Sequence, residues 1–249
     1  MKIHRAIAVI AVLGLPLPAT AHAADIKLLE GNALNAVMEE LGPQFEKATE
    51  NKLVVTLGTS AQLKARIDGG EAFDAVLLTK AALDELATAG KVADAPRAAI
   101  ARAGIGVAIR KGAAKPDLST TEAFKQAMLN AKSIGFVDQT PTAAALKAIF
   151  AKLGIADEIK AKLKPLTIQA AVAVTNGDVE IAMTQISEIL PYPGAELAGP
   201  LPPDIQTYTT FSGGISAAAK NAEAAVALIK FLTSPDAKAL IKAKGMEPG

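Results

Sequence analysis

The sequence predicts an α/β fold in which mostly parallel sheets are flanked by helices. Short apolar runs alternate with segments whose apolar residues recur at helical spacing, and this alternation appears in two successive groups of elements. The segment Ile100 to Arg110 lies between the groups and reads as a glycine-punctuated strand suited to a crossing between domains. Strands that alternate with helices pair in parallel and are covered on both faces.

The first 23 residues have the pattern of a secretory signal peptide. Lys2 and Arg5 precede an apolar run from Ala6 to Leu17, which is too short for a comfortable transmembrane helix. Ala21-His22-Ala23 offers a cleavage site between small residues. We therefore expect cleavage and a periplasmic mature protein. Cleavage removes two of the 26 basic residues and none of the 25 acidic ones, so the mature net charge is −1.

Composition excludes several classes of function. A near-neutral chain without a polybasic cluster lacks the basic surface that binds nucleic acid. The chain has no cysteine, and both histidines, His4 and His22, lie in the predicted signal peptide. The mature protein therefore has neither a Ser-His triad nor a thiolate or imidazole metal site. We expect no metal and no cofactor.

The chain is organised around Leu53 to Ala89, which contains two successive strand-to-helix junctions. Leu53 to Leu57 reads as a strand, and Gly58-Thr59-Ser60 leads from it into a helix. Ala75 to Leu78 reads as a second buried strand, and Thr79 precedes another helix. Both junctions are expected at one edge of a parallel sheet, where open α/β sheets bind ligands.

Such junctions suit small anions. The first amides of a helix lack internal partners and lie at the positive end of its dipole, so an anion satisfies both. Thr59, Ser60 and Thr79 add neutral hydroxyl donors. An interpretation as ordinary helix N-caps remains open for each of them.

Two further junctions follow the same pattern. Ile26 to Glu30 reads as a strand, and Gly31-Asn32 leads into a helix. Ser133 to Val137 reads as a strand that ends in Asp138, and Gln139-Thr140-Pro141-Thr142 opens a helix.

The last third of the chain contains two more predicted strands. Val179 to Thr184 delivers Gln185, and Thr207 to Phe211 follows a proline-rich segment. Five prolines between residues 191 and 203 predict irregular structure around Ala195 to Ala198. The C-terminal segments are predicted to be helical.

The order of these motifs resembles the molybdate-binding family of periplasmic solute-binding proteins of ABC transporters. The resemblance covers most of the mature chain, and its motifs are the segment from GNALNAVMEEL through LATAGKV, then GIGVAIRKG, KSIGFVD, VTNGDVEIAMTQISEILP and FLTSPDAKALIKAKG. It implies a two-lobed type II periplasmic-binding-protein fold, a cleft between the lobes and delivery of a small-molecule anion to ABC transporter membrane subunits by a monomer.

The resemblance also implies a division of the chain. Lobe 1 is expected to comprise residues 24–105 and 209–249, and lobe 2 residues 106–208. The crossings are expected near Ala103 to Ala108 and near Thr207 to Phe211. The predicted ligand-binding residues are Gly31, Asn32, Thr59, Ser60, Thr79 and Lys80 from lobe 1 and Thr140, Thr142 and Gln185 from lobe 2.

Three positions depart from the family pattern. The family's first-loop serine falls on Ala33, Ala61 follows the retained Ser60, and the family's second-lobe tyrosine falls on Gln185. An oxyanion left without a donor loses roughly 1 to 3 kcal/mol per missing bond. We therefore expect an organic anion more than an oxyanion such as molybdate.

Lys80 is expected either to face the ligand or, equally, to be a solvated lysine in the first turn of its helix. Lys64 lies beyond the first turn of its helix and is expected on the surface.

An enzymatic alternative comes from the segments FEKAT, ALDEL, AFKQA and QISE, which resemble periplasmic aconitate isomerase. Moving a double bond in a tricarboxylate requires a positioned base. Without histidine, the candidates are Glu30, Asp138, Glu188, Tyr192 and Tyr208. Glu30 and Asp138 are favoured as catalytic residues because both end predicted strands, although both could equally cap neighbouring helices. Glu188 is expected to support its loop. A chemosensory or orphan binding module is a third alternative.

Overall fold

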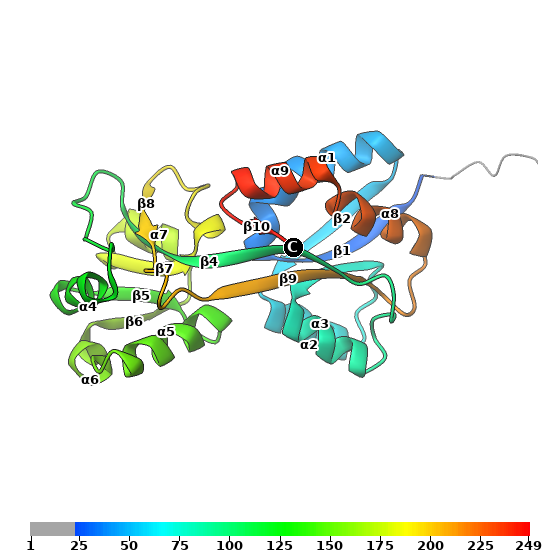
Figure 1. Ribbon diagram of the computed structural model, residues 1–249. Coiled ribbons are helices and arrows are strands. Elements are labelled where there is room, and N and C mark those ends of the chain that lie inside the picture. Colours follow the sequence, from blue (N-terminus) through cyan, green and yellow to red (C-terminus); the bar gives the residue numbers. More distant parts are fainter. Residues whose placement is uncertain (1–22) are drawn as a thin grey trace, which may run out of the picture.

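The computed structural model describes residues 23–249, which fold into two α/β lobes joined by long strands (Figure 1). The predicted fold class, mixed sheets flanked by helices, is confirmed. Residues 1–22 of the predicted signal peptide lie outside the described part of the chain. Within residues 23–249, no helix has both the length and the apolar character to cross a membrane.

The strands are β1 (Asp25–Gly31), β2 (Lys52–Gly58), β3 (Ala75–Thr79), β4 (Ala98–Arg110), β5 (Ile134–Val137), β6 (Leu163–Leu166), β7 (Ile181–Gln185), β8 (Ala195–Pro200), β9 (Tyr208–Ile215) and β10 (Glu247–Pro248). The α-helices are α1 (Asn35–Thr49), α2 (Ser60–Asp68), α3 (Lys80–Thr88), α4 (Thr121–Asn130), α5 (Pro141–Lys152), α6 (Ala156–Ile159), α7 (Ala170–Asn176), α8 (Ala222–Leu232) and α9 (Pro235–Ala243). Short 3-10 helices are η1 (Asn32–Leu34), η2 (Lys160–Lys162) and η3 (Ile186–Glu188).

Lobe 1 contains β1 to β3 with α1 to α3, α8 and α9 (Figure 1). Strand β1 pairs in parallel with β2 on one side and β3 on the other, with Gly31 opposite Gly58 and Glu30 opposite Leu77. All three strands therefore end at the same edge of the sheet, as the sequence predicts. The loops that start η1, α2 and α3 meet there.

Strands β4 and β9 run between the lobes as an antiparallel pair (Figure 1). The far half of β4 pairs antiparallel with β7 and β8, so one network of ten strands passes through both lobes. The prediction of two mixed sheets is confirmed, because β4 takes part in one sheet with β9 and in a second sheet with β7 and β8. The antiparallel strand pairs all involve β4 or β9. Each crossing segment carries the chain directly from lobe to lobe, without a helical crossover, so the strand pairs that it makes are antiparallel. The predicted boundary at residue 105/106 falls inside β4 and stays a prediction.

Lobe 2 contains α4 to α7 and the strands β5 to β8. Strand β5 pairs in parallel with β6 and β7. Strand β8 corrects the prediction of irregular structure around Ala195 to Ala198, because this segment pairs antiparallel with β4. The strand fits between the prolines since Pro193 precedes it and Pro200 is its last residue, where a missing amide is tolerated.

Each lobe has its own hydrophobic core. In lobe 1, Ile26 and Leu28 of β1 join the cluster under α1, α8 and α9, whereas Leu29 joins the cluster under α2 and α3. Successive strand residues point to opposite faces, so one strand supplies both layers. Two further clusters fill lobe 2. Separate cores make the lobes two compact units with a cleft between them.

Candidate functional site

A cavity of about 600 Å³ lies between the two lobes and is lined by residues from both. Eight of the nine predicted ligand-binding residues line it: Gly31, Asn32, Thr59, Ser60, Thr79, Thr140, Thr142 and Gln185. The exception is Lys80. The strand-to-helix junctions of the two lobes therefore face one another across a single space. Contact between these residues and a ligand stays a prediction.

The lobe 1 wall presents three hydroxyls that have free hydrogens. Thr59 Oγ1 accepts the Gln62 amide at 3.2 Å, and the Gln62 side chain accepts the Thr59 amide at 3.0 Å, which makes a capping box. Thr79 Oγ1 accepts the Ala82 amide at 3.4 Å. Ser60 Oγ accepts the Thr79 amide at 3.0 Å. Because each hydroxyl acts as an acceptor toward the protein, its hydrogen is left to donate to a ligand.

Three helix N-termini open at the cavity. The lining includes residues from the first turns of α2, α3 and α5, each a helix of nine residues or more. The first amides of these helices lack intrahelical partners, and the three dipoles put partial positive charge at the same space. The cavity thus favours an anion without a buried lysine or arginine.

The lobe 2 wall uses its polar groups differently. Thr140 Oγ1 donates to the Val137 carbonyl at 2.8 Å and accepts the Ala143 amide at 3.1 Å, so its hydroxyl is committed to the fold. Gln185 is 6% exposed, and its Oε1 has no hydrogen-bond partner among the described residues. Thr142 is 7% exposed.

Glu188 brings a carboxyl group into the cavity. It ends η3 and lines the space, and the Thr184 hydroxyl donates to its Oε2. Burial raises the pKa of Glu188, and the hydrogen bonds from Thr184 and the Gln185 amide oppose that rise only in part. The sequence offered Glu188 both as a candidate base and as support for its loop, and its place in the lining favours a role at the cavity.

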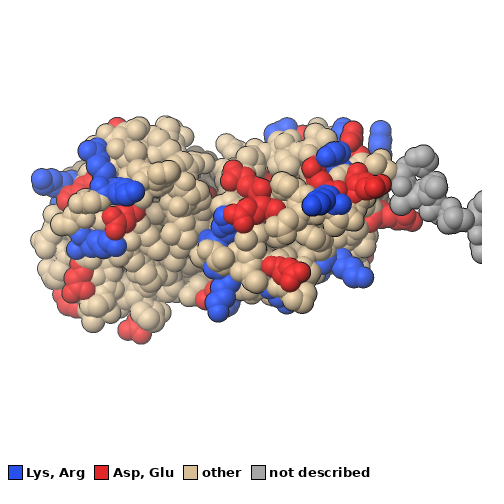
Figure 2. Space-filling model, turned by 90° about the horizontal axis from the view of Figure 1, so that it is seen from above, with Lys and Arg blue, Asp and Glu red and all other residues tan. Residues whose placement is uncertain are grey.

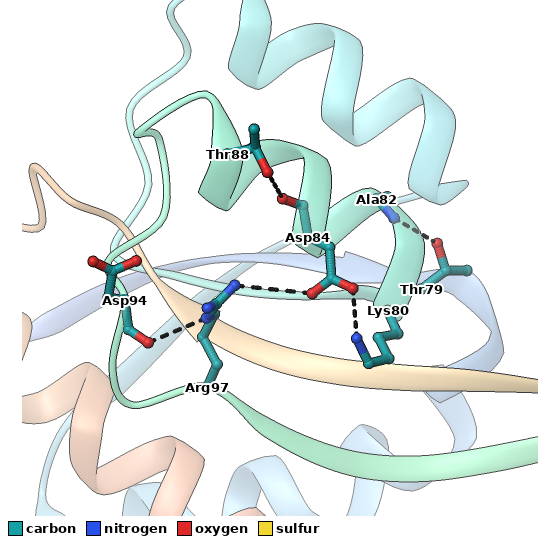
Figure 3. Close-up of polar contacts among 7 residues, drawn as sticks. All are labelled: Thr79, Lys80, Ala82, Asp84, Thr88, Asp94 and Arg97. Carbon is teal, nitrogen blue, oxygen red and sulfur yellow. Dashed lines mark hydrogen bonds and ion pairs between the residues drawn. The ribbon is translucent and has the colours of Figure 1, made fainter.

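Lys80 is not among the residues that line the cavity. Figure 3 shows its side chain beside Asp84 of the same helix, so the alternative of a solvated lysine fits better than a lysine that faces a ligand. Its Nζ is 2.5 Å from Asp84 Oδ2 one helical turn onward, and Asp84 also lies 3.8 Å from Arg97 Nη1. The Lys80 side chain is 61% exposed. Thr79 turns inward as the cap of α3, so the next residue starts on the outer face of the helix.

A different lysine lines the cavity. Lys64 Nζ lies 2.8 Å from Asp68 Oδ2 and 3.4 Å from Glu85 Oε2, and both Lys64 and Glu85 belong to the lining. The sequence-based interpretation placed Lys64 on the surface because it lies beyond the first helical turn. Its spacing of four from Ser60 was the available signal, since residues at i and i+4 share a helix face.

Neither of the two favoured catalytic residues lines the cavity. Glu30 is 1% exposed on the strand face that packs under α1, α8 and α9. Burial and the charge of Glu39 raise the pKa of Glu30 to about 8. Asp138 is exposed and lies 2.9 Å from Lys147 Nζ, a hydrogen bond that lowers the Asp138 pKa. Both strands end at the cleft, but neither side chain turns into it.

The surface charge carries no single-sign patch on the face in Figure 2, where lysines and arginines are interspersed with aspartates and glutamates over the described residues. The distinctive electrostatic feature is therefore the cavity itself. It combines helix amides and neutral hydroxyls with a Lys64–Glu85 pair and one further carboxyl.

Comparison with known proteins gives the family. The sequence profile of the bacterial extracellular solute-binding proteins matches residues 26–247. Aconitate isomerase from a Pseudomonas species is 30% identical over 239 residues, covering 94% of this chain and 91% of that protein. The molybdate-binding protein ModA from Azotobacter vinelandii is 26% identical over 240 residues, covering 92% of each.

Solved structures agree on the fold. The periplasmic molybdate-binding protein of Azotobacter vinelandii matches with a TM-score of 0.77 at 19% identity, over 90% of this chain and 100% of that chain. At this identity the likeness concerns the fold alone. Together, the matches confirm the family resemblance that the motifs predict.

Proposed function

Because the chain belongs to the bacterial extracellular solute-binding protein family, we propose that it captures a small organic anion bearing carboxylates. In this proposal the mature chain is a periplasmic monomer. It closes its lobes over the ligand and delivers it to the membrane subunits of an ABC-type transporter. The observation that carries the proposal is the convergence of three helix N-termini and three donor hydroxyls on one cavity.

Carboxylates suit this cavity better than a tetrahedral oxyanion. Ala33 and Gln185 stand where the related molybdate-binding family has hydroxyl donors, and Ala33 lines the cavity without a polar side chain. A volume of about 600 Å³ is within the range of sites for small organic ligands. The free hydroxyls of Thr59, Ser60 and Thr79 can serve one carboxylate while lobe 2 contacts the rest of the molecule.

A thermal-shift screen of the mature chain tests this proposal. The panel contains molybdate, tungstate, sulfate and phosphate beside mono-, di- and tricarboxylates that include citrate, cis-aconitate and trans-aconitate. A ligand at 100 times its Kd stabilises the native state by about 2.7 kcal/mol, so the best carboxylate should raise the Tm clearly. A response confined to molybdate and tungstate would contradict the choice of ligand class.

The second candidate function is aconitate isomerisation. The 30% identical relative and the Glu188 carboxyl in the cavity both favour it. In this reaction a base breaks a methylene C–H bond next to a carboxylate, the double bond shifts, and the same proton forms a new C–H bond at the former vinyl carbon. Of the carboxyls considered from the sequence, Glu188 is the one positioned in the lining to carry that proton.

Proton NMR in heavy water separates the two candidates. Capture without turnover predicts that cis- and trans-aconitate keep their C–H protons and do not interconvert in the presence of the protein. Deuterium uptake or interconversion at a rate proportional to protein concentration would establish the enzyme. Loss of that rate in Glu188→Gln, with ligand binding retained, would identify the base.

A further inference from the structure

Glu188 is the charged side chain of the cavity that lacks an opposite charge. The charged residues of the lining are Lys64, Glu85 and Glu188, and the first two lie 3.4 Å apart at their charged atoms. Within residues 23–249, no lysine or arginine forms an ion pair with Glu188. Its recorded partners are the Thr184 hydroxyl and the Gln185 amide.

The groups around Glu188 do not supply a cation either. Tyr192, in the loop after η3, has its pKa raised by burial and by the negative charges of Glu188 and Glu39. Across the cavity lie Lys64 and Glu85, already paired with each other. Each of these neighbours is neutral, is negatively charged or is already paired with an opposite charge.

The position of Glu188 is fixed at the junction between the lobes. Ser187, the preceding residue, is 2% exposed and donates through Oγ to the Ala33 carbonyl of η1 at 3.0 Å. This bond joins η3 of lobe 2 to η1 of lobe 1. Glu188 therefore follows a residue that contacts both lobes, and Glu188 itself lines the cavity between them.

An anion in this cleft brings a second negative charge into a partly desolvated space. Two carboxylates that share a site without a cation cannot both ionise cheaply, and one of them is protonated instead. A protonated carboxyl also becomes a hydrogen-bond donor toward a carboxylate. Burial already raises the pKa of Glu188 in the free protein, so adding this proton costs less than it would for an exposed glutamate.

We propose that binding of an anion in the cleft brings one proton onto Glu188, and that the neutral carboxyl then donates a hydrogen bond to the ligand. This inference rests on the proposed capture of an anion in the same cavity. It applies to capture without turnover, because a protonated Glu188 cannot act as the base of the isomerisation. The ligand class is a di- or tricarboxylate that is fully ionised in solution, bound with uptake of a proton from the medium.

The consequence is a pH dependence of affinity with a definite sign. Below the pKa of Glu188 in the free protein the proton is already present, and affinity is constant. Above it, each pH unit weakens binding by up to about tenfold, because the proton that binding requires comes from a solution whose proton concentration falls as the pH rises. Affinity becomes constant again above the pKa of Glu188 in the complex.

Isothermal titration calorimetry of the full mature chain with trans-aconitate tests the proposal. Its carboxyls titrate near ordinary values of about 4, so between pH 6.5 and 9 its own ionisation does not change. Titrations in phosphate and in Tris, which differ in ionisation enthalpy, report the protons taken up. The wild-type protein should take up a measurable fraction of one proton, and its Kd should rise with pH.

Two variants make the assignment specific. Glu188→Gln keeps the shape and a donor but cannot titrate, so it should bind without proton uptake and with a pH-independent Kd. Glu196→Gln changes a partly exposed lobe 2 carboxylate that pairs with Lys115 outside the cavity, and should retain wild-type uptake. Circular dichroism checks that both fold.

The outcomes separate this inference from the proposed function. Binding of trans-aconitate without proton uptake by the wild type, or uptake that survives in Glu188→Gln, overturns the role of Glu188 while leaving anion capture intact. Should trans-aconitate fail to bind, the same titrations with molybdate test proton uptake and the carboxylate preference fails alone. Absence of binding by either anion at millimolar concentration overturns both.

Discussion

The two walls of the cleft use the same kinds of residues to different ends. In lobe 1, the hydroxyls of Thr59, Ser60 and Thr79 accept helix amides and keep their hydrogens for a ligand. In lobe 2, the Thr140 hydroxyl both donates and accepts a hydrogen bond within the protein, so it has no hydrogen left for a ligand. The group that lobe 2 offers to a ligand instead is the Glu188 carboxyl. Lobe 1 is thus a preformed set of neutral donors, whereas lobe 2 carries a group whose chemistry depends on protonation.

The contrast indicates how affinity and discrimination are divided. Donors fixed by helix caps need no rearrangement to receive an anion, so lobe 1 is the wall expected to bind first. A titratable carboxyl binds ligands that can share its proton more tightly than ligands that cannot. Lobe 2 is therefore expected to discriminate among anions. Substitutions in each wall test this division.

The largest expected effect concerns Glu30, the buried carboxyl behind the lobe 1 wall. Its pKa is raised to about 8, so its contribution to folding is complete below pH 4.5 and is lost as the pH rises toward 8. The total loss is about 5 kcal/mol at roughly 1.4 kcal/mol per pH unit. Glu30→Gln should flatten this dependence in urea denaturation between pH 5 and 9, and Asp138→Asn should leave it unchanged. An unchanged slope in Glu30→Gln would refute the account of this residue.

A smaller loss is expected at Asp74, which anchors lobe 1. It is 3% exposed and accepts the amides of Lys27 at 3.0 Å, Lys220 at 2.9 Å and Asn221 at 3.0 Å. Burial opposes its ionisation, but these bonds outweigh it and lower the Asp74 pKa. Asp74→Ala should cost about 3 kcal/mol of unfolding free energy, because the partly buried amides lose their acceptor.

The matched lobe 2 variant is Glu180→Ala, which removes an exposed acceptor of the Lys132 amide. It should cost about 1 kcal/mol or less in the same denaturation experiment. Stability that falls equally in both variants would count against the special role of Asp74.

The donor role of the lobe 1 wall is tested by Ser60→Ala. The variant loses a hydrogen for the ligand and the acceptor of the Thr79 amide, so the Kd for the best carboxylate should rise about 10- to 100-fold, equivalent to roughly 1 to 3 kcal/mol. In Thr140→Ala, the lost cap should cost about 1 kcal/mol of stability with little change in Kd. The reverse ranking of the two Kd values would contradict the difference between the walls.

The smallest effect is expected for Lys80→Ala. Because this lysine pairs with Asp84 on the exposed side of α3, removing it should change the Kd by less than about twofold. Titration calorimetry beside the wild type measures the change. A tenfold loss of affinity would show that the Lys80 charge acts on the bound ligand despite its outward position.

Much of the fold follows from sequence pattern alone. Buried runs such as Ala75 to Leu78, each followed by a capping hydroxyl, predict the strands and the residues at their carboxyl ends. Parallel pairing of β1 with β2 and β3 then brings three junctions to one edge. These local rules are strong because capping and burial act within a few residues.

The orientation of charged side chains was harder to predict. Glu30 ends a strand at the cleft, yet it shares the strand face of Ile26 and Leu28, and the alternation of side chains turns it into the core. Lys64 lines the cavity and Lys80 does not, because the phase of each helix decides which of its side chains face the cleft. The environment of Glu188 depends on the docking of η3 against η1, a contact between residues 154 positions apart.

The central claim is that an anion is held between lobes that close on it. The chain contains no cysteine, so two exposed alanines, Ala65 on α2 of lobe 1 and Ala151 on α5 of lobe 2, can be replaced by cysteine and spin-labelled selectively. Pulsed electron resonance then measures the distance between the labels with and without saturating trans-aconitate. The account predicts a shorter distance in the bound protein. A distance that stays the same, while calorimetry on the labelled protein shows the ligand bound, would contradict it.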